Sequence, residues 1–546
     1  YERCESNQDV PRWVGELYLE YHRGTYTSMA RNKRSNRKCE LLWQDVEFFS
    51  VFAQLLGVPY DAKEIHDSWE IILLNQFHDI LPGSSIKEVY GVTKVEYEAL
   101  EKRAHEIISE KIAAIANACK AKANDLVLFN SLSFDRSDVA IIKNDGYKNV
   151  TSFKDEKGNK YPVQHTADNQ IAFNPKAVPA KGYDVYTPCI DNDIFENKIT
   201  VNGNEIDTPY YHITLDKAGQ FTSLFDKLAR RETLKIGEKG NVLRVYEDKP
   251  IYYDNWDIEI YYTQKSWVAD DVQKMEWIEN GPVRAVLQID RKFLDSTIVQ
   301  KIIFYTNSKR IDFDTYVDWK QHQLLLKCEF PIDVNANEAT YDIQFGNVKR
   351  PTHKNTSWDA ARFEVCGHKW ADLSEGNFGM ALLNDCKYGY GITEGKMTLS
   401  LIKSGIVPNP TTDQEEHFFT YSILPHNSSF ETAQIQKEAY CLNVPMYGAR
   451  VKAPECKFAT TTLLSIDADN VIIETVKRAE DGKGTIIRMY EDQNKRTNAT
   501  IHWHKQFASV VECDLMEHAI EAPITATSEF SFTIKPFEIK TFKVVE

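Results

Sequence analysis

A histidine and an aspartate stand side by side at His78 and Asp79, between the apolar run 71–74 and Pro82. Proline disfavours helix at the residue before it, so we expect both side chains in the last turn of a helix, at the edge of a buried core. Imidazole and carboxylate are ligand types that Zn²⁺ uses, and both groups also bind sugar hydroxyls. Neighbours on a helix point about 100° apart, which favours one metal ligand and one substrate contact. The alternative is a histidine that caps the carboxyl end of its helix.

A second polar cluster surrounds Gly24 in the segment 15–28. The cluster consists of Glu16, Glu20, His22 and Arg23. These side chains predict either a polar loop beside a ligand or a loop held together by ion pairs. A basic run follows, which we interpret as a solvated helix face. Its members are Lys33, Arg34, Arg37 and Lys38.

A third candidate lies in a strand-like region, where Asp254 and Asp257 flank Trp256. Glycosidases use two carboxyl groups, about 5–5.5 Å apart when the anomeric configuration is retained. The three residues are therefore candidates for lining a sugar site, and the alternative is a hairpin with aromatic cross-strand pairs. The polar and aromatic segment 349–372 is expected at a domain interface or near the site.

The remaining chemistry-bearing signals are weak. Strand alternation places His502 and His504 on one face, a weak indication of metal binding. The net charge of −15 argues against nucleic acid and anionic membranes as partners, and no apolar run approaches the about 20 residues of a membrane-spanning helix. The ten cysteines include no Cys-x-x-Cys pair, which favours reduced thiols.

The elements that must position these residues begin with helices. Apolar side chains at helical spacing predict three helices within 12–122, and capping-box patterns at 61–64 and 85–88 open the second and third. Three such helices with short loops predict an antiparallel three-helix bundle. The first helix is marked by Leu42, Val46, Phe49, Ala53 and Leu56.

From residue 123 onward, short apolar strands alternate with turn signals, which predicts antiparallel β-sandwiches. The expected fold class is a multidomain α+β protein, with an antiparallel three-helix bundle followed by antiparallel β-sandwich domains. Clear strands are expected at 126–129, 140–142, 170–173, 285–289, 302–305 and 530–534. The expected domains are the end of a preceding domain at 1–11, the bundle at 12–122, a first β region at 123–200, a large sandwich at 201–430 and a C-terminal sandwich at 431–546.

Taken together, these motifs resemble the alpha-mannosidases of glycoside hydrolase family 38. Segment 15–28 is similar to the start of that family's middle domain, segment 74–85 resembles its His-Asp motif, and segment 126–130 resembles the entry to its C-terminal β region. Further segments are similar to the branch with bacterial, cytosolic and vacuolar members, namely 254–258, 350–358, 368–375, 384–389 and 535–542.

The resemblance implies a zinc-dependent retaining exo-alpha-mannosidase, which releases terminal alpha-linked mannose from oligosaccharides. By position, His78 matches the family's C-terminal zinc ligand and Asp79 the residue that hydrogen-bonds sugar hydroxyls. His22 falls, more loosely, where related enzymes place an aromatic residue near the sugar. We expect Arg23 to contact the substrate from the same loop.

The family's nucleophile, acid/base and other zinc ligands, which include a His-x-Asp pair, lie on an α/β domain ahead of the helices. This chain contains no His-x-Asp pair, so the resemblance implies only the middle and C-terminal domains and no catalytic residue. On this interpretation residues 1–11 are a remnant of the catalytic domain, and the chain alone is expected to be inactive.

The expected partner is a mannose-containing oligosaccharide, with Zn²⁺ as the cofactor of the complete enzyme. A cytoplasmic location is expected, nucleic acid and membrane are not expected as partners, and a homo-oligomer is compatible with the sequence. The alternative function is a non-catalytic carbohydrate-binding or scaffolding β-sandwich protein.

Overall fold

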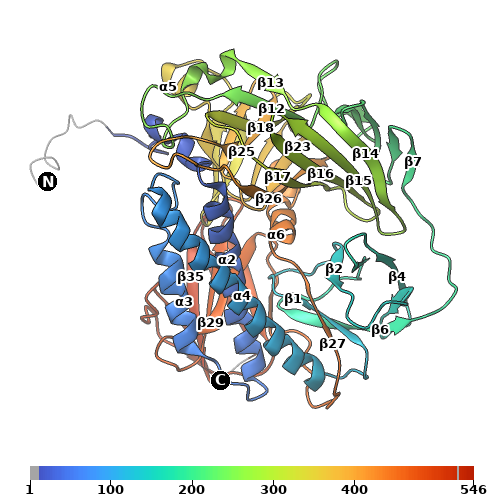
Figure 1. The fold of residues 1–546 in the computed structure, drawn as a ribbon. Coiled ribbons are helices and arrows are strands. Elements are labelled where there is room, and N and C mark those ends of the chain that lie inside the picture. Colours follow the sequence, from blue (N-terminus) through green and yellow to red (C-terminus); the bar gives the residue numbers. More distant parts are fainter. Residues whose placement is uncertain (1–11, 526–527, 546) are drawn as a thin grey trace, which may run out of the picture.

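The computed structural model describes residues 12–525 and 528–545, with helices in the first part of the chain and strands in the rest (Figure 1). The predicted remnant at 1–11 lies outside the described residues. The three long helices are α2 (Ala30–Gln54), α3 (Ala62–Leu74) and α4 (Lys87–Ala118). The short ones are η1 (Glu20–His22), η2 (Gly24–Tyr26), η3 (Ile260–Gln264), α5 (Ser357–Ala361), η4 (Phe430–Thr432) and α6 (Ile435–Asn443).

The helix caps match the sequence prediction only in part. Asp61 caps α3, because its carboxylate accepts a hydrogen bond from the Glu64 amide at 3.2 Å. The predicted cap at Ser85 is wrong: α4 has Ile86 at its N-cap, without a side-chain bond. The Ser85 amide instead donates to the hydroxyl of Tyr90 at 2.9 Å.

The end of α3 also differs from the prediction. The helix stops at Leu74, so His78 and Asp79 lie in a succession of turns rather than in its last turn. Asn75 closes the helix, and the following amides continue in short-range bonds, such as Phe77 to the Leu74 carbonyl at 3.1 Å. The apolar run is not buried as a whole, since Leu74 is 63% exposed.

Three sheets build the large β domain, drawn in green and yellow at the top of Figure 1. The nine-stranded sheet has the order β14 (Asp271–Asn280), β15 (Arg284–Phe293), β16 (Ser296–Tyr305), β17 (Ile311–Asp318), β26 (Glu416–His426), β23 (Gly379–Asn384), β22 (Trp370–Ser374), β19 (Glu338–Ile343) and β20 (Gly346–Pro351). The six-stranded sheet has the order β13 (Ser266–Val268), β12 (Val242–Glu247), β18 (Leu324–Pro331), β25 (Lys396–Lys403), β24 (Gly389–Thr393) and β21 (Val365–Cys366). The five-stranded sheet has the order β11 (Arg231–Glu232), β10 (Phe221–Asp226), β9 (Tyr211–Leu215), β8 (Glu205–Asp207) and β7 (Thr200–Asn202).

Three further sheets complete the β structure. A seven-stranded sheet has the order β2 (Ala140–Lys143), β5 (Gln170–Phe173), β4 (Lys160–His165), β3 (Ser152–Lys154), β6 (Gly182–Cys189), β1 (Leu126–Asn130) and β27 (Tyr447–Arg450). The C-terminal sandwich consists of two sheets. The first has the order β28 (Leu464–Ile466), β31 (Thr497–Trp503) and β34 (Glu529–Ile534). The second has the order β29 (Val471–Arg478), β30 (Thr485–Glu491), β35 (Ile539–Val545), β32 (Ser509–Cys513) and β33 (Ile524–Thr525).

The fold is a mixed α+β architecture dominated by antiparallel sheets. The strands predicted from the sequence examples all form, as β1, β2, β5, β15, β16 and β34. No helix among the described residues is long and apolar enough to cross a membrane. The cysteines of the described part are free, in agreement with the prediction of reduced thiols.

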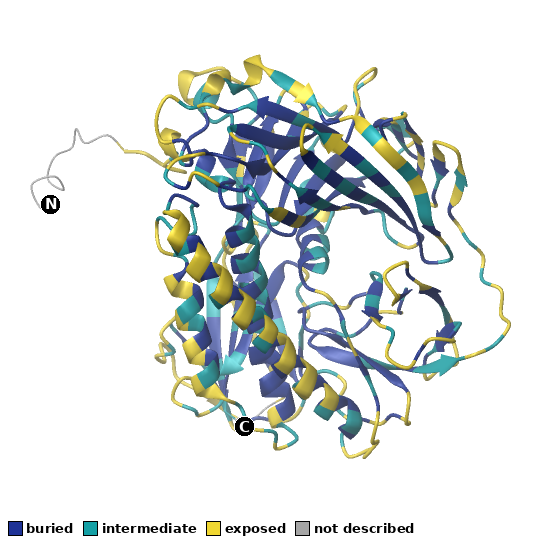
Figure 2. Ribbon diagram, viewed as in Figure 1, coloured by how far each residue is buried: buried dark blue, intermediate teal, exposed yellow. Residues whose placement is uncertain are grey.

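The helices do not have a core of their own. Most of their buried apolar side chains belong to one cluster with strands of the C-terminal sandwich and of the seven-stranded sheet, and the inner faces of the helices are dark in Figure 2. Phe49 of α2 makes edge contacts with the rings of Phe129 and Tyr447, at 5.8 and 5.4 Å between centroids. The same cluster contains Ile473 and Ile487 of β29 and β30. The sandwich and the seven-stranded sheet therefore together cover the inner side of the helices.

Candidate functional site

The His78–Asp79 loop presents both of its polar side chains to solvent. The His78 side chain is 76% exposed and that of Asp79 is 44% exposed. His78 Nε2 lies 3.4 Å from the Asp79 carboxylate, and the imidazole packs on the Phe77 ring at 4.3 Å. The Asp79 carboxylate also accepts a hydrogen bond from the Ser84 hydroxyl at 2.8 Å. This arrangement leaves an imidazole and a carboxylate oxygen available to a ligand.

The backbone of this loop is fixed from two sides. The Tyr90 hydroxyl on α4 lies 3.1 Å from the Asp79 carbonyl and accepts the Ser85 amide. On the other side, Lys33 of α2 donates to the carbonyls of Ser28 and Leu81 at 2.6 and 2.8 Å. Burial lowers the pKa of Lys33 to about 7. The loop is therefore held between two helices by buried polar contacts.

Gly83 allows a close approach that no other residue could make. Its φ is +86°, and an added Cβ would lie 2.2 Å from the Ser28 carbonyl oxygen. The Gly83 carbonyl in turn accepts a hydrogen bond from the Asn255 amide at 3.0 Å. A left-handed backbone at a crowded position is the situation in which glycine is required.

Asn255 joins the loop to the second and third candidate segments. Its carbonyl accepts a bond from the Ser28 hydroxyl at 2.7 Å. The neighbouring Trp256 carbonyl accepts the amides of Gly24 and Thr25 at 2.8 and 3.2 Å. The structure thus brings together the segments 15–28, 71–85 and 252–262, which lie far apart in the sequence.

Within the third segment, the side chains of Asp254 and Asp257 are buried and bind other groups of the chain. The Asp254 carboxylate accepts the Ile406 amide at 2.6 Å. The Asp257 carboxylate accepts its neighbour's amide, from Ile258, at 2.8 Å, and lies 3.4 Å from Arg23. Trp256 is half-buried between them. Their role at a sugar site stays a prediction.

The second segment divides into an exposed and a buried part. His22 is exposed at the end of η1, whereas Arg23 is 7% exposed. The Arg23 guanidinium donates to the Ala361 carbonyl at 2.9 Å and stacks 4.4 Å from the Phe363 ring. Glu20 contributes its carbonyl to the same guanidinium. His22 is therefore accessible to a ligand, and Arg23 holds the loop on the large β domain.

The fourth segment, 349–372, contacts the second. Arg350 forms a bidentate ion pair with Glu16, at 2.8 and 2.6 Å. The Trp13 and Trp358 rings lie 4.8 Å apart. The prediction of an interface for this segment fits these contacts, because they join the chain ahead of the helices to the large β domain.

The basic run on α2 is not the solvated face that we predicted. Lys33 and Arg37 are each 4% exposed. Arg37 donates to the Tyr388 hydroxyl at 3.0 Å and to the Asn384 side-chain oxygen at 2.9 Å. The prediction fails because these cations bind carbonyl and hydroxyl groups from distant segments, which charge patterning along one helix does not reveal.

Among residues 12–525 and 528–545, no three His, Cys, Asp or Glu side chains converge on a metal position. His502 is paired instead with Glu529, at 3.1 Å. A zinc site needs three or four protein ligands. His78 offers one exposed imidazole, with the Asp79 carboxylate beside it, so this donor set fits one edge of a zinc site and not a complete one.

The supporting residues of the loop are those that sequence reasoning missed. Tyr90 carried no motif, Lys33 was assigned to a solvated basic run, and only the Pro82-Gly83 pair signalled a tight turn. Asn255 stood within a candidate segment without a role. Each of them acts through backbone atoms of a partner segment, and such contacts leave no pattern in the sequence.

Family models match three parts of the chain. The alpha mannosidase middle domain matches residues 20–115, and the glycosyl hydrolases family 38 C-terminal domain matches 206–411. The family 38 C-terminal beta sandwich domain matches 470–542. The chain belongs to glycoside hydrolase family 38. In family terms, the His78–Asp79 loop lies on the middle domain and Asn255 on the first C-terminal domain, so the contacts between them join two matched domains.

Similar proteins extend the family 38 match to almost the whole chain. It is 35% identical to Alpha-mannosidase G of Dictyostelium discoideum, over 98% of this chain and 53% of that protein. It is 32% identical to Alpha-mannosidase 2C1 of Homo sapiens, over 99% of this chain and 51% of that protein. The chain thus spans about half the length of the curated relatives it matches. The fold is that of a solved alpha-mannosidase from Enterococcus faecalis V583, with a TM-score of 0.84 at 16% identity, over 100% of this chain and 71% of that one.

Proposed function

We propose that this chain is the C-terminal part of a zinc-dependent, retaining alpha-mannosidase that removes terminal alpha-linked mannose from oligosaccharides. The curated relatives are named alpha-mannosidases, which supports the reaction class. In this proposal α2, α3 and α4 form the three-helix middle domain, and the nucleophile and acid/base belong to a preceding domain. A cytoplasmic location and a homo-oligomer remain predictions.

The observation that carries the proposal is the exposed and rigidly held His78–Asp79 loop. A side chain that contacts substrate must be accessible, and its backbone must be fixed for the contact to be productive. His78 and Asp79 meet both conditions, because their side chains face solvent while Tyr90 and Lys33 hold their backbone.

In the complete enzyme, His78 would supply one imidazole ligand to zinc. Zinc, when bound, would polarise and orient the sugar's hydroxyl groups. Asp79 would accept hydrogen bonds from those hydroxyls. One of its carboxylate oxygens already accepts the Ser84 hydroxyl, which leaves the other for the sugar. Charge-assisted bonds of this kind are worth about 1.5–3 kcal/mol each.

We expect the isolated chain to be inactive. The reason is that its described residues supply one edge of a zinc site and no complete metal cluster. The measurement is release of a chromogenic alpha-mannoside with added Zn²⁺. Turnover in the ordinary enzyme range, about 1–10³ s⁻¹, would refute the assignment of catalysis to a preceding domain.

In the complete enzyme, we expect His78→Ala to lower kcat/KM by about 100-fold or more and to reduce zinc retention on dialysis. Loss of a residue that only supports a metal ligand already costs about 10–100-fold, so loss of the ligand should cost at least as much. The matched control is His322→Ala, at an exposed turn of the large β domain. Full activity and full zinc retention in His78→Ala would contradict the ligand role.

The alternative is a non-catalytic carbohydrate-binding protein. It makes the opposite prediction for the complete reading frame, which would then carry no His-x-Asp pair ahead of the helices and would show no turnover with any alpha-mannoside.

A further inference from the structure

A cavity of about 1160 Å³ lies between α2, α3 and the C-terminal sandwich. We call it the helix–sandwich cavity. Ligand pockets in proteins measure roughly 300–1,000 Å³, so it has room for a ligand of several sugar units. Its walls come from four parts of the fold, represented by Glu40, Trp69, Phe345, His368 and Glu474.

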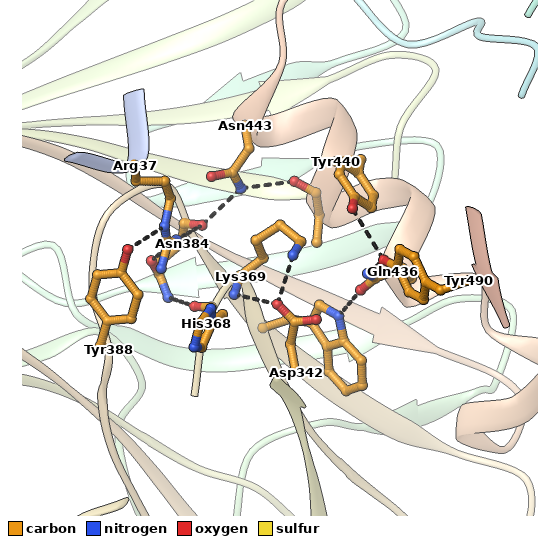
Figure 3. A network of polar contacts seen from close by, with 12 residues as sticks. Arg37, Asp342, His368, Lys369, Asn384, Tyr388, Gln436, Tyr440, Asn443 and Tyr490 are labelled. Carbon is orange, nitrogen blue, oxygen red and sulfur yellow. Dashed lines mark hydrogen bonds and ion pairs between the residues drawn. The ribbon is translucent and has the colours of Figure 1, made fainter. Parts of the chain in front are cut away.

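One wall of the cavity is a fixed polar network, shown in Figure 3. Arg37 binds Tyr388 and Asn384, and the Asn384 amide donates to the His368 carbonyl at 2.9 Å. Lys369 pairs with Asp342 at 3.0 Å. These contacts hold most of the wall's polar side chains in place, although one carboxylate oxygen of Asp342 has no hydrogen-bond partner. The wall is therefore largely preorganised for a ligand.

The same network reaches the C-terminal sandwich. The hydroxyls of Tyr440 on α6 and Tyr490 on β30 lie 3.1 Å apart, and the Gln436 amide donates to Tyr490 at 2.7 Å (Figure 3). Because Tyr440 and Tyr490 also line the cavity, three packed parts of the fold share one wall.

Two polar groups on the wall stand apart from this network. In the described part of the chain, the Glu474 carboxylate and the His368 ring nitrogens have no hydrogen bond or ion pair, and both residues are half-buried. Burial lowers the pKa of His368 to about 3, which keeps its imidazole neutral, and burial raises the pKa of Glu474. A ligand with hydroxyl groups has donors for the Glu474 carboxylate and both a donor and an acceptor for the neutral imidazole of His368.

The remaining lining suits an uncharged ligand. Half-buried aromatic side chains, among them Tyr60, Trp69 and Tyr388, offer apolar surface with polar edges. The wall carries five carboxyl groups against six ammonium or guanidinium groups, so it has no strong net field of either sign. A phosphate or another anion would find an excess of only one positive charge here.

We propose that the helix–sandwich cavity binds a neutral, hydroxyl-rich ligand, namely a short oligosaccharide. Access is open, because exposed residues such as His66 and Glu480 stand among the lining residues. His78 and Asp79 do not line the cavity, although Leu81 and Pro82 of their loop do. That the sugar is alpha-mannose rests on the proposed function, whereas the cavity's preference for a neutral sugar does not.

The test is calorimetric titration of the chain with neutral trisaccharides built from alpha-linked mannose, glucose or galactose, and with inorganic phosphate. We expect saturable binding of at least one sugar and none of phosphate. Glu474→Gln should weaken this binding about tenfold, because a charged acceptor is replaced by a neutral one. Trp69→Ala should weaken it more than Trp69→Phe does. The matched control is Glu110→Gln on the exposed surface of α4.

Hydrogen exchange locates the ligand independently of these variants. We expect the bound sugar to protect amides of α3 and β29, even if one variant fails to fold. Absence of saturable sugar binding, binding of phosphate in preference to sugar, or equal affinity in Glu474→Gln and the native chain would overturn the proposal.

A double variant, His78→Ala with Asp79→Asn, separates the cavity from the proposed function. If the sugar no longer binds in the double variant but binds normally in Glu474→Gln, the ligand sits at the loop and the cavity proposal fails. If a sugar binds in the cavity while the complete enzyme cleaves no alpha-mannoside, the cavity proposal stands and the proposed function fails.

Discussion

Single buried charges on α2 decide how this helix contacts the rest of the molecule. Lys33 donates to two backbone carbonyls, and Arg37 is held by Tyr388 and Asn384. Glu47 is 6% exposed on the same helix. Burial of an ionised side chain is tolerated only with such partners. Two of the four residues of the predicted surface run, Lys33 and Arg37, are therefore fixed by buried contacts.

Glu47 gives a test of this view through pH. Burial raises its pKa from 4.5 to about 7, against the opposing charge of Lys477. Because the folded state holds this proton more tightly than the unfolded state, the contribution of Glu47 to stability is full below pH 4.5 and is lost as pH rises through about 7. We expect Glu47→Gln to remove this loss and to raise the free energy of unfolding at pH 8 by about 1–3 kcal/mol.

The measurement is urea unfolding of both proteins at pH 5 and pH 8, with Glu110→Gln as the exposed control. The same change of stability with pH in Glu47→Gln as in the native chain would show that another group is responsible.

At the scale of elements, much of the chain could be predicted from local patterns. The helical spacing of Leu42, Val46, Phe49 and Ala53 identified α2, and all four are buried. The apolar runs that became β1, β15 and β34 were found in the same way. These predictions work because burial on one face imposes a period that neighbouring residues reveal.

Other features of the elements could not be predicted, because they depend on distant partners. The end of α3 at Leu74 and the entry of α4 at Lys87 are set by the loop's contacts with Tyr90 and Lys33. The pairing of β27 with β1 joins segments more than 300 residues apart, as Leu126 opposite Arg450 illustrates. At the candidate site, the sequence identified His78 and Asp79 as chemically suitable residues. It did not reveal that Tyr90 and Lys33 hold the backbone of their loop.

Gly83 and Gly91 form a matched pair for testing the loop. An added Cβ at Gly83 would meet the Ser28 backbone at 2.2 Å with φ at +86°, whereas Gly91 on α4 has open space around it. We expect Gly83→Ala to lower the free energy of unfolding by about 2–4 kcal/mol and Gly91→Ala to raise it by up to about 1 kcal/mol. Chemical denaturation measures both. Similar effects of the two changes would mean that the approach of the loop to Ser28 is not tight.

At the scale of the whole molecule, the helices and the C-terminal sandwich share one apolar cluster. Side chains of α2, such as Phe52, and of β30, such as Ile487, bury surface against a common interior. A domain with its own core can unfold alone, but two parts with one core lose stability together.

We therefore expect helix and sandwich to unfold in one transition. Hydrogen exchange of α2 amides should follow the helices, and exchange of β30 amides should follow the sandwich, with coincident midpoints in urea. Ile487→Ala should shift both midpoints equally. A large-to-small change in a core lowers the free energy of unfolding by about 2–5 kcal/mol, and here both parts share that core. Two separate transitions, or a shift of only one, would contradict a shared core.

The position of β35 has a consequence for how the protein is made. This strand, Ile539–Val545, lies between β30 and β32 in the middle of its sheet. The sheet that covers α2 cannot close until those residues have been synthesised. At about 5–20 residues per second, a ribosome needs roughly 25–100 s to travel from the end of α2 to the end of β35. Throughout that interval α2 lacks the part of its cover that the C-terminal sandwich supplies, and we expect this nascent chain to be a client of chaperones that bind apolar segments.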